Sequence, residues 1–464
     1  MKRPLREDLV TAACLEAYGS VRHEGRLADR ALELTLRHKR HLYSNERRAV
    51  AERVYALLRR QRTVDFLLER ARPDFRQLPT TRQDLLRFAA VGVLEGQAPR
   101  QVAKSLTLGG DAAVLDRLGA ANAALATLPE PTRLGVTASL PDFLAELFLA
   151  ELGKEAYAAA EAMNERAPLC ARVNTLKTDR PALIARLRTE GVECRETPLS
   201  PFGLWLDTRL NAFSLPAFKE GLFELQDEGS QLLGMLVDAP PTKVVDACAG
   251  AGGKTLQLAA QMKNRGELFA LDIDEVRLEA LKKRARRAGV HNVRARLIPT
   301  GEEALAALTD LEAKAGRVLV DAPCSGSGTF RRKPDARYRL TPEELQLHVE
   351  RQKALLARFA TLVKPGGRLV YGTCSLLRTE NEEVVEGFLS THADFALRPV
   401  SEDLGPALGA KVSRDGCLRL FPHVHGTDGF FGAVLVKRNL PSPPTLSPRE
   451  RERELVGEAE QHRP

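Results

Sequence analysis

The stretch KVVDACAGAGGKTLQLAAQMKNRGELFALDID, residues 243–274, decides the fold class of this chain. KVVDACA is a short apolar strand that runs into a glycine-rich turn and a helix, and ELFALDI is a second strand. VRARLI, RVLVDAP and GRLVYGT continue the strands with helices between them, and VLVK closes the sheet. This alternation is typical of a parallel sheet wrapped by helices, with ligands at the carboxyl ends of its strands. We therefore expect an α/β domain over residues 226–438.

The glycine turn GAGGKT (250–255) predicts a site for a nucleotide-containing cofactor. Glycines there let the backbone turn tightly and approach a ligand at a helix N-terminus. Asp272 ends the next strand about 20 residues later, where a carboxylate can accept hydrogen bonds from ribose hydroxyls. Asp274 suits a different role, as the N-cap of the following helix. Because Thr255 stands where GxGxxG has its third glycine, the turn alone fits NAD or S-adenosylmethionine.

Two cysteines directly follow two predicted strands. Asp321 and Cys324 lie in DAPCSGSG, and Cys374 lies in GTCS, so both thiols are expected at the cofactor edge of the sheet. A buried structural role is the alternative for each cysteine taken singly. A thiolate that adds to C6 of cytosine makes C5 nucleophilic enough to accept a methyl group. A carboxyl such as Asp321 could hold the base and help to protonate it, and a second thiol could assist release.

Three further regions flank or precede this domain. Residues 1–135 read as an all-α module, and residues 141–225 as a small α+β subdomain, with a Pro-rich boundary at 128–144. Residues 440–464 are Pro-rich and charged and are expected to be disordered. Residues 1–70 hold 16 Lys and Arg against 10 Asp and Glu, most of the net charge of +8. This excess suggests a polyanionic partner, or else a well-solvated helical surface. The predicted basic face of the longest helix carries Arg47, Arg48, Arg53, Arg59, Arg60 and Arg62.

Composition excludes several classes of protein. No apolar run reaches about 18 residues, so no membrane span is expected, and the N-terminus lacks an apolar signal-peptide core. The seven cysteines are odd in number and are never spaced as CxxC, so we expect neither a disulfide framework nor a zinc site. His423 and His425 have no evident further ligands, so no metal is expected. A cytoplasmic protein follows from these observations.

Several motifs resemble those of one family. DACAGAGGKT (246–255), LDID (271–274), DAPCSGSGTFRRKPD (321–335) and GTCSLLRTENEE (372–383) are similar to motifs of the RsmB branch, also called Sun or Fmu, of the RNA 5-methylcytosine methyltransferases. RVNTLK (172–177), FELQDEGSQL (223–232) and DGFF (428–431) extend the resemblance over about 141–437. Residues 1–135 resemble the NusB-like RNA-binding domain of this branch. The resemblance implies a Rossmann-like class I methyltransferase fold, S-adenosylmethionine as cofactor, 16S ribosomal RNA as substrate and a monomeric enzyme.

The resemblance also implies residue roles. Cys374 would be the nucleophile and Cys324 would assist product release, whereas DNA cytosine methyltransferases use the PC cysteine as nucleophile. Lys254 would lie near the methionine end of the cofactor and the base, Asp272 at the ribose, and Asp321 at the base or the methionyl group. The other implied cofactor contacts are Ala247, Cys248, Ala249, Gly250, Gly252, Gly253 and Thr300, and the implied RNA contacts are Arg172, Arg331, Arg332 and Lys333.

The chain departs from the family pattern at two points. Ala251 stands where proline is common, and LIPTGEE lacks the usual Asp near the adenine, for which Thr300 or Glu302 would substitute. Two other functions are alternatives: an RNA-binding assembly factor whose methyltransferase fold is inactive, and a nicotinamide dehydrogenase, which the broken GxGxxG disfavours. Another RNA such as tRNA is an alternative substrate, and the sequence does not identify the target cytosine.

Overall fold

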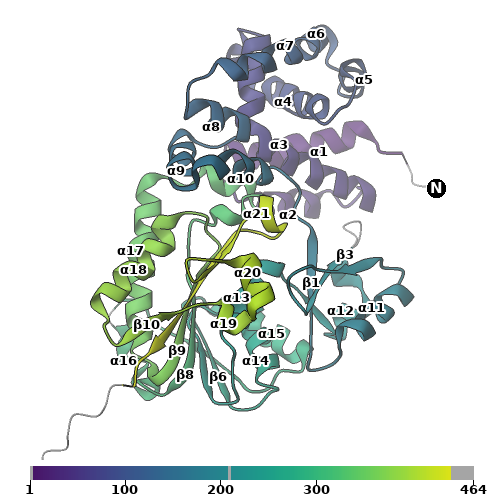
Figure 1. The fold of residues 1–464 in the computed structure, drawn as a ribbon. Coiled ribbons are helices and arrows are strands. Elements are labelled where there is room, and N and C mark those ends of the chain that lie inside the picture. The colour runs from purple at the N-terminus through teal and green to yellow at the C-terminus, as the bar shows by residue number, and fades with distance from the viewer. Residues whose placement is uncertain (1–3, 207–210, 302, 440–464) are drawn as a thin grey trace, which may run out of the picture.

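A helical lobe sits on an α/β body in the computed structural model, which describes residues 4–206, 211–301 and 303–439 (Figure 1). The predicted tail at 440–464 and Glu302 lie outside the described residues. The longest helix, α3, runs through the lobe, and one side of it is buried. Tyr18 and Phe88 pack edge to face beside it, with ring centroids 5.6 Å apart. The helices of the lobe are α1 (Glu7–Arg22), α2 (Ala28–His38), α3 (Ser44–Ala71), α4 (Thr80–Leu94), α5 (Pro99–Ser105), α6 (Ala112–Asp116) and α7 (Leu118–Ala123).

Three connecting helices pack on the α/β body. They are α8 (Thr132–Ala138), α9 (Asp142–Leu152) and α10 (Ala156–Ala162). Their apolar side chains share a buried cluster with Phe330, Leu376 and Phe421 of the body. Gly153, with a φ of 54°, ends α9 and separates it from α10. The chain therefore reaches the body before the small subdomain begins.

The small subdomain contains a four-stranded antiparallel sheet in the order β2-β3-β1-β4. Its apolar side chains form a separate buried cluster that includes Val173, Leu204 and Phe223. Figure 1 shows it as a teal unit beside the main sheet. Its elements are β1 (Leu169–Val173), α11 (Arg180–Thr189), β2 (Cys194–Glu196), β3 (Gly203–Leu206), α12 (Pro216–Lys219) and β4 (Phe223–Leu225).

The main sheet has the strand order β11-β12-β13-β9-β8-β5-β6-β7, and β10 pairs with β13. Strands β5 to β9 pair in parallel, and the order reverses between β5 and β8, where α/β proteins bind their ligands. The strands are β5 (Lys243–Asp246), β6 (Glu267–Asp272), β7 (Val293–Leu297), β8 (Ala315–Asp321), β9 (Val363–Thr373), β10 (Phe395–Arg398), β11 (Ser413–Arg414), β12 (Cys417–Leu420) and β13 (Phe430–Lys437).

The predicted α/β class is confirmed, but the expectation of a wholly parallel sheet is wrong. Strand β13 pairs antiparallel with β9, and the short strands β10, β11 and β12 extend that side. They are only two to four residues long, too short for a clear periodicity. Helices α13 (Glu228–Leu236), α14 (Gly253–Gln261), α15 (Glu275–Ala288), α16 (Glu303–Ala306), α17 (Pro342–Ala360), α18 (Glu382–Thr391), α19 (Ser401–Leu404), α20 (Pro406–Val412) and α21 (Pro422–His425) complete the body.

One fully buried arginine joins the lobe, the connecting helices and the body. Arg337 donates to the carbonyl oxygens of Ala138 at 3.1 Å and Met163 at 3.0 Å, and to Asn164 Oδ1 at 2.7 Å. Its side chain is 0% exposed, and this burial lowers the pKa of Arg337 to about 10. Carbonyl oxygens thus take the place of an acidic partner in solvating the guanidinium.

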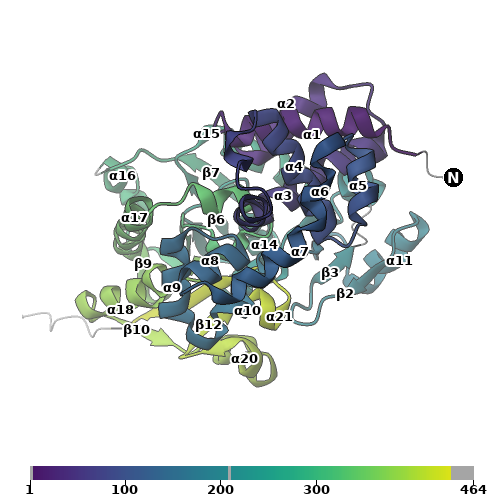
Figure 2. The same cartoon turned by 90° about the horizontal axis from the view of Figure 1, so that it is seen from above.

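The loop that carries Arg337 also docks on α3. Tyr338 donates its hydroxyl to the carbonyl of Leu58 at 3.1 Å. Arg59 donates through Nε and Nη2 to the carbonyl of Arg331 at 3.1 and 3.0 Å. Seen from above in Figure 2, the lobe and connecting helices lie over the α/β body. The loop of the DAPCSGSGTFRRKPD motif is therefore held from the helical side as well as from the sheet.

We predict that Arg337→Ala lowers the free energy of unfolding by about 3 kcal/mol, because it leaves a cavity and buried carbonyls without donors. The measurement is urea unfolding followed by circular dichroism. Arg339→Ala is the control, since Arg339 is an exposed neighbour paired with Asp335, and it is expected to cost less than about 1 kcal/mol. Equal losses in the two variants would contradict the joining role of Arg337.

Candidate active site

The glycine turn lies between β5 and α14 and is tied to the end of β6. Gly250 and Gly252 adopt φ values of 51° and 89°, which favour glycine. The amide of Gly250 donates to Asp272 Oδ2 at 2.7 Å. Asp274 caps α15, because its carboxylate accepts from the amide of Arg277 at 3.1 Å, so the N-cap interpretation is confirmed. Asp272 thus fixes the turn and lies beside it, in the position predicted for a ribose contact.

The turn has the features that a nucleoside-containing cofactor needs. A Cβ built on Gly250 or Gly253 would meet nothing within 4 Å, so the backbone there faces open space. Ile273 and Val276 are 63% and 79% exposed beside the end of β6, where large apolar side chains are unexpected unless a ligand covers them. The sequence interpretation missed Ile273, although an apolar residue directly after the strand-end acid is a usable signal. Thr300 is exposed after β7.

Beneath the turn lies a buried carboxylate that was also missed. Asp246, at the end of β5, accepts from Thr255 Oγ1 at 2.7 Å through Oδ2. Its Oδ1 has no hydrogen-bond partner among the described residues. Burial raises the pKa of Asp246 to about 7. Cys248 in the same turn is held as a thiol, because burial raises its pKa. The predicted contacts Ala247 and Ala249 bond to the strands through their amides, at Leu319 and Leu271.

Lys254 and Asp321 form an ion pair across the site. Lys254 Nζ lies 2.7 Å from Asp321 Oδ2, which joins the first turn of α14 to the end of β8. The ammonium also lies 5.5 Å from the ring centroid of Phe430. The side chain of Lys254 is 10% exposed and that of Asp321 is 29% exposed, so the carboxylate remains open toward the cleft. Two residues predicted for the site are thus brought together.

The two cysteines meet at the ends of β8 and β9. Asp321 is paired with Gly372 in the parallel register, so the loops after the two strands leave the sheet side by side. Cys324 Sγ and Cys374 Sγ are 3.4 Å apart, and both residues are half-buried. The hydrogen bond with Cys374 and then burial raise the pKa of Cys324 well above its ordinary value. Cys324 is thereby held as a thiol beside its neighbour.

Three backbone segments touch behind the thiols. The amide of Gly328 donates to the carbonyl of Cys374 at 2.9 Å, and the amide of Gly429 donates to the carbonyl of Gly328 at 2.8 Å. A Cβ on Gly328 would lie 2.4 Å from the Gly429 carbonyl oxygen. Only glycine allows this approach, which explains why GSG and DGFF contain glycine at these positions.

The four predicted RNA contacts differ in exposure. Arg172 is 3% exposed and donates to the carbonyl of Gly253 at 2.9 Å, and burial lowers its pKa to about 9. Arg331 is 3% exposed and lies 2.6 Å from Asp428. Burial argues against the predicted RNA contacts of both and favours positioning roles. Arg332 is partly exposed, although it pairs with Asp428, and Lys333 is exposed, so both remain predictions.

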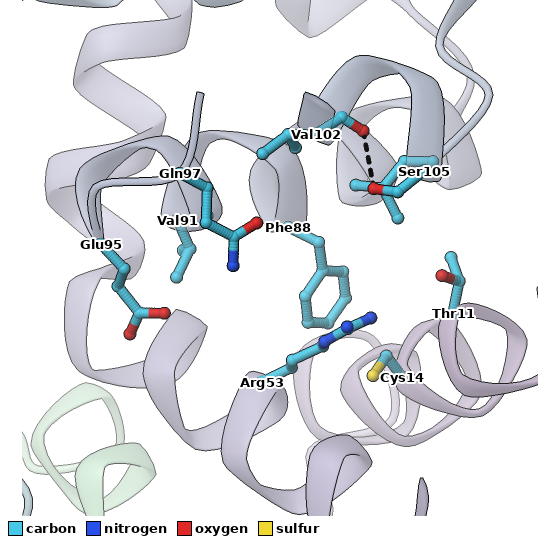
Figure 3. Close-up of a pocket in the computed structure, with 11 residues that line it drawn as sticks. Thr11, Cys14, Arg53, Phe88, Val91, Glu95, Gln97, Val102 and Ser105 are labelled. Carbon is cyan, nitrogen blue, oxygen red and sulfur yellow. Dashed lines mark hydrogen bonds between the residues drawn. The ribbon is translucent and has the colours of Figure 1, made fainter. Parts of the chain in front are cut away.

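A small pocket in the helical lobe is not this site. Figure 3 shows Cys14, Arg53 and Phe88 around it, and its volume is about 60 Å³. That is about the liquid volume of two water molecules, too little for a nucleotide. Within the described residues, no three His, Cys, Asp or Glu side chains are grouped so that they could hold a metal ion. Likewise, no helix in the described ranges is long and apolar enough to cross a membrane.

These features define the class of the protein. A sheet with a strand-order reversal, a glycine turn at that reversal and a strand-end carboxylate is the Rossmann-like fold of the class I S-adenosylmethionine-dependent methyltransferases. The crystal structure of PH0851 matches with a TM-score of 0.74 and 28% identity, covering 94% of this chain and all of that one. A methyltransferase homologue from Pyrococcus horikoshii gives a TM-score of 0.57 at 31% identity, covering 67% of this chain and all of that one.

The chain belongs to the RsmB/F family of 16S rRNA methyltransferases. Residues 235–436 match the family described as 16S rRNA methyltransferase RsmB/F, and residues 140–212 match the ferredoxin-like domain of RsmF/B-like methyltransferases. The probable ribosomal RNA small subunit methyltransferase B of Synechocystis is 34% identical over 435 residues, which cover 88% of this chain and 94% of that protein. The Bacillus subtilis protein of the same description is 37% identical, covering 58% and 59%. S-adenosylmethionine is the methyl donor, as the motifs predicted.

We predict that Asp246→Asn removes a pH dependence of stability. The pKa of Asp246 is about 7 when folded and about 4 in an unfolded chain. The folded state therefore favours the protonated carboxyl. The contribution of this carboxyl to the free energy of unfolding is fully present below pH about 4 and is lost as the pH rises to about 7. Relative to the original chain, Asp246→Asn should gain about 4 kcal/mol of unfolding free energy between pH 4 and pH 8. Urea unfolding at both pH values measures this change. Asp116→Asn, at an exposed carboxylate, is the control. The same change in unfolding free energy with pH in the original chain and in Asp246→Asn would refute the prediction.

Proposed function

We propose that this protein methylates C5 of a cytosine in 16S rRNA through a covalent bond between Cys374 Sγ and C6 of the base. The observation that carries the proposal is the pair of thiols 3.4 Å apart at the ends of β8 and β9, beside the Lys254–Asp321 ion pair. Cofactor and base must meet where the strand order reverses, and all four side chains lie there.

The geometry supports separate roles for Cys374, Asp321 and Lys254 in the first half of the reaction. The Cys374 thiolate adds to C6, and the electron pair of the C5–C6 bond becomes available at C5. Asp321, with one oxygen bound by Lys254, can accept a hydrogen bond from the N4 amino group and so orient the base. The Lys254 ammonium offsets charge that develops on the ring. S-adenosylmethionine supplies the methyl group when it is bound at the glycine turn.

Release of the product needs the second thiol. The proton on C5 leaves to water or a nearby base, and the electron pair of the S–C6 bond returns to Cys374 Sγ as that bond breaks. Cys324 can protonate the departing sulfur, because its Sγ lies 3.4 Å away and its raised pKa keeps the proton on it until then. The two cysteines thus act as nucleophile and acid, in that order.

The RNA would also contact a basic groove between the lobe and residues 164–166, which follow α10. The groove has a volume of about 630 Å³ and is lined by five arginines against two glutamates. Burial and then the charge of Arg166 lower the pKa of Arg59, a sign of crowded positive charge. Phosphates would relieve that repulsion. The carbonyl contact from Arg59 to Arg331 links the groove to the catalytic loop. The arginines are Arg48, Arg53, Arg59, Arg60 and Arg166.

Opposite outcomes are predicted for the two cysteines. Cys324→Ala should accumulate a covalent protein–RNA adduct, because addition proceeds but release fails, and Cys374→Ala should form none. Gel mobility of the denatured complex and transfer of tritium from labelled S-adenosylmethionine measure this. Cys194→Ala, in the small subdomain, is the matched control and should behave as the original chain. Adduct in Cys374→Ala instead of Cys324→Ala would reverse the roles.

Bisulfite sequencing of ribosomal and transfer RNA from a deletion strain would identify the substrate.

Substitutions in the groove should reduce the salt dependence of RNA binding. Each of Arg60→Gln and Arg166→Gln removes one phosphate contact, so the slope of log K against log salt should fall by about 1 per substitution. Filter binding at several salt concentrations measures the slope. Arg70→Gln, on the same helix as Arg60 but outside the groove lining, should leave the slope unchanged. Deleting residues 1–135 should also reduce the slope of log K against log salt. The deletion exposes the surface of the body that α3 covers, so it is a less specific test of the groove.

A further inference from the structure

A buried carboxylate lies between the two cysteine loops. Glu380 ends the short 3-10 helix Arg378–Glu380 and is 0% exposed. Its Oε1 accepts from the amide of Ser325 at 2.8 Å and from Gln352 Nε2 at 2.9 Å, and its Oε2 accepts from Ser325 Oγ at 2.5 Å. Among the described residues no cationic side chain forms an ion pair with it.

The hydrogen bonds of Glu380 all come from donors. The backbone amide of Ser325 and the side-chain NH2 group of Gln352 can only donate, and the serine hydroxyl supplies a third donor, so the site suits an acceptor with two oxygens. A charge in the protein interior acts over a longer distance than one at the surface. The carboxylate therefore projects negative potential onto the groups beside it.

Glu380 and its neighbour hold the two loops differently. The side chain of Glu380 binds the Cys324 loop directly through Ser325, which follows Cys324. Its other partner, Gln352, binds the same loop by donating to the carbonyl of Pro323 at 3.0 Å. Asn381 holds the Cys374 loop instead, and donates to the carbonyl of Ser375 at 3.0 Å. The Cys374 loop is also bound by Arg419, which donates to the carbonyl of Leu376 at 3.1 Å. A carboxylate thus lies directly behind Cys324, whereas an amide and a guanidinium bind the residues directly behind Cys374.

We propose that Glu380 is a positioning residue that assigns Cys324 its role as the acid, because its carboxylate lies against the Cys324 loop and opposes loss of the Cys324 proton. The inference rests on the proposed covalent function and deepens it. The raised pKa of Cys324 agrees with it, since the charge of Glu380 is among its causes, after the hydrogen bond with Cys374, burial and the charge of Cys374.

The test measures the ionisation of Cys324 alone. The full-length chain carries Cys374→Ser, iodoacetamide is the probe, and mass spectrometry quantifies alkylated Cys324 at a series of pH values. Adding Glu380→Gln should lower the pH midpoint of Cys324 alkylation by about one unit. Glu383→Gln is the matched control, because Glu383 is exposed three residues away and loses the same charge, and it should leave the midpoint unchanged.

Two further variants separate charge from loop position. Ser325→Ala removes one hydrogen bond but keeps the Glu380 charge, so the midpoint should stay high. Gln352→Lys places an ammonium beside Glu380 and should lower the pH midpoint of Cys324 alkylation. This variant tests the effect of the charge even if Glu380→Gln does not fold. An unchanged midpoint in both Glu380→Gln and Gln352→Lys, or an equal fall in Ser325→Ala, would overturn the proposal. Alkylation needs neither RNA nor cofactor, so failure of methyl transfer would count against the proposed function and not against this test.

Discussion

The parallel pairing of β8 with β9 is the constraint on which the site depends. It brings the loops of Cys324 and Cys374 to one edge of the sheet, although the two residues are 50 positions apart in the sequence. Strand pairing sets the position of each loop only to within a few ångströms. The contacts of Gly328 with Cys374 and Gly429 then hold the loops backbone to backbone. The thiol separation follows from main-chain hydrogen bonds, which are harder to displace than side-chain contacts.

The site concentrates charges that the fold alone does not need. Asp246 and Glu380 are buried without cationic partners, and Asp321 has one partner, Lys254. Burying a carboxylate is costly unless hydrogen bonds or a counter-charge offset it, so such groups weaken the folded state. Their positions around the glycine turn and the thiols match the rule that buried titratable groups gather at functional sites.

The sequence predicted the residues at the strand ends of this site better than the buried residues and short strands that hold them in place. The glycine turn, Asp272, Asp321 and the two cysteines follow directly from motifs at strand ends, and the structure brings them to one edge. The burial of Arg172 could not be read from sequence, because an arginine beside a β-strand looks the same whether it faces solvent or a carbonyl. The antiparallel strands β10 to β12 were missed because they are short and gain their stability from β13 rather than from a pattern of their own.

The helical lobe contacts the loop that follows Cys324. Residues 331–340 follow Cys324 by a few positions, and they bind α3 through Tyr338 and the connecting helices through Arg337. Arg59, which lines the basic groove, bonds the carbonyl of Arg331, next to Arg332. RNA that binds Arg59 would therefore act on a loop whose other end carries Cys324. Because Arg331 and Arg332 are both paired with Asp428 of the DGFF loop, any such shift would reach the Gly328–Gly429 contact behind the thiols. Binding and chemistry are thus joined by a continuous set of hydrogen bonds, which a lobe on a flexible linker would not provide.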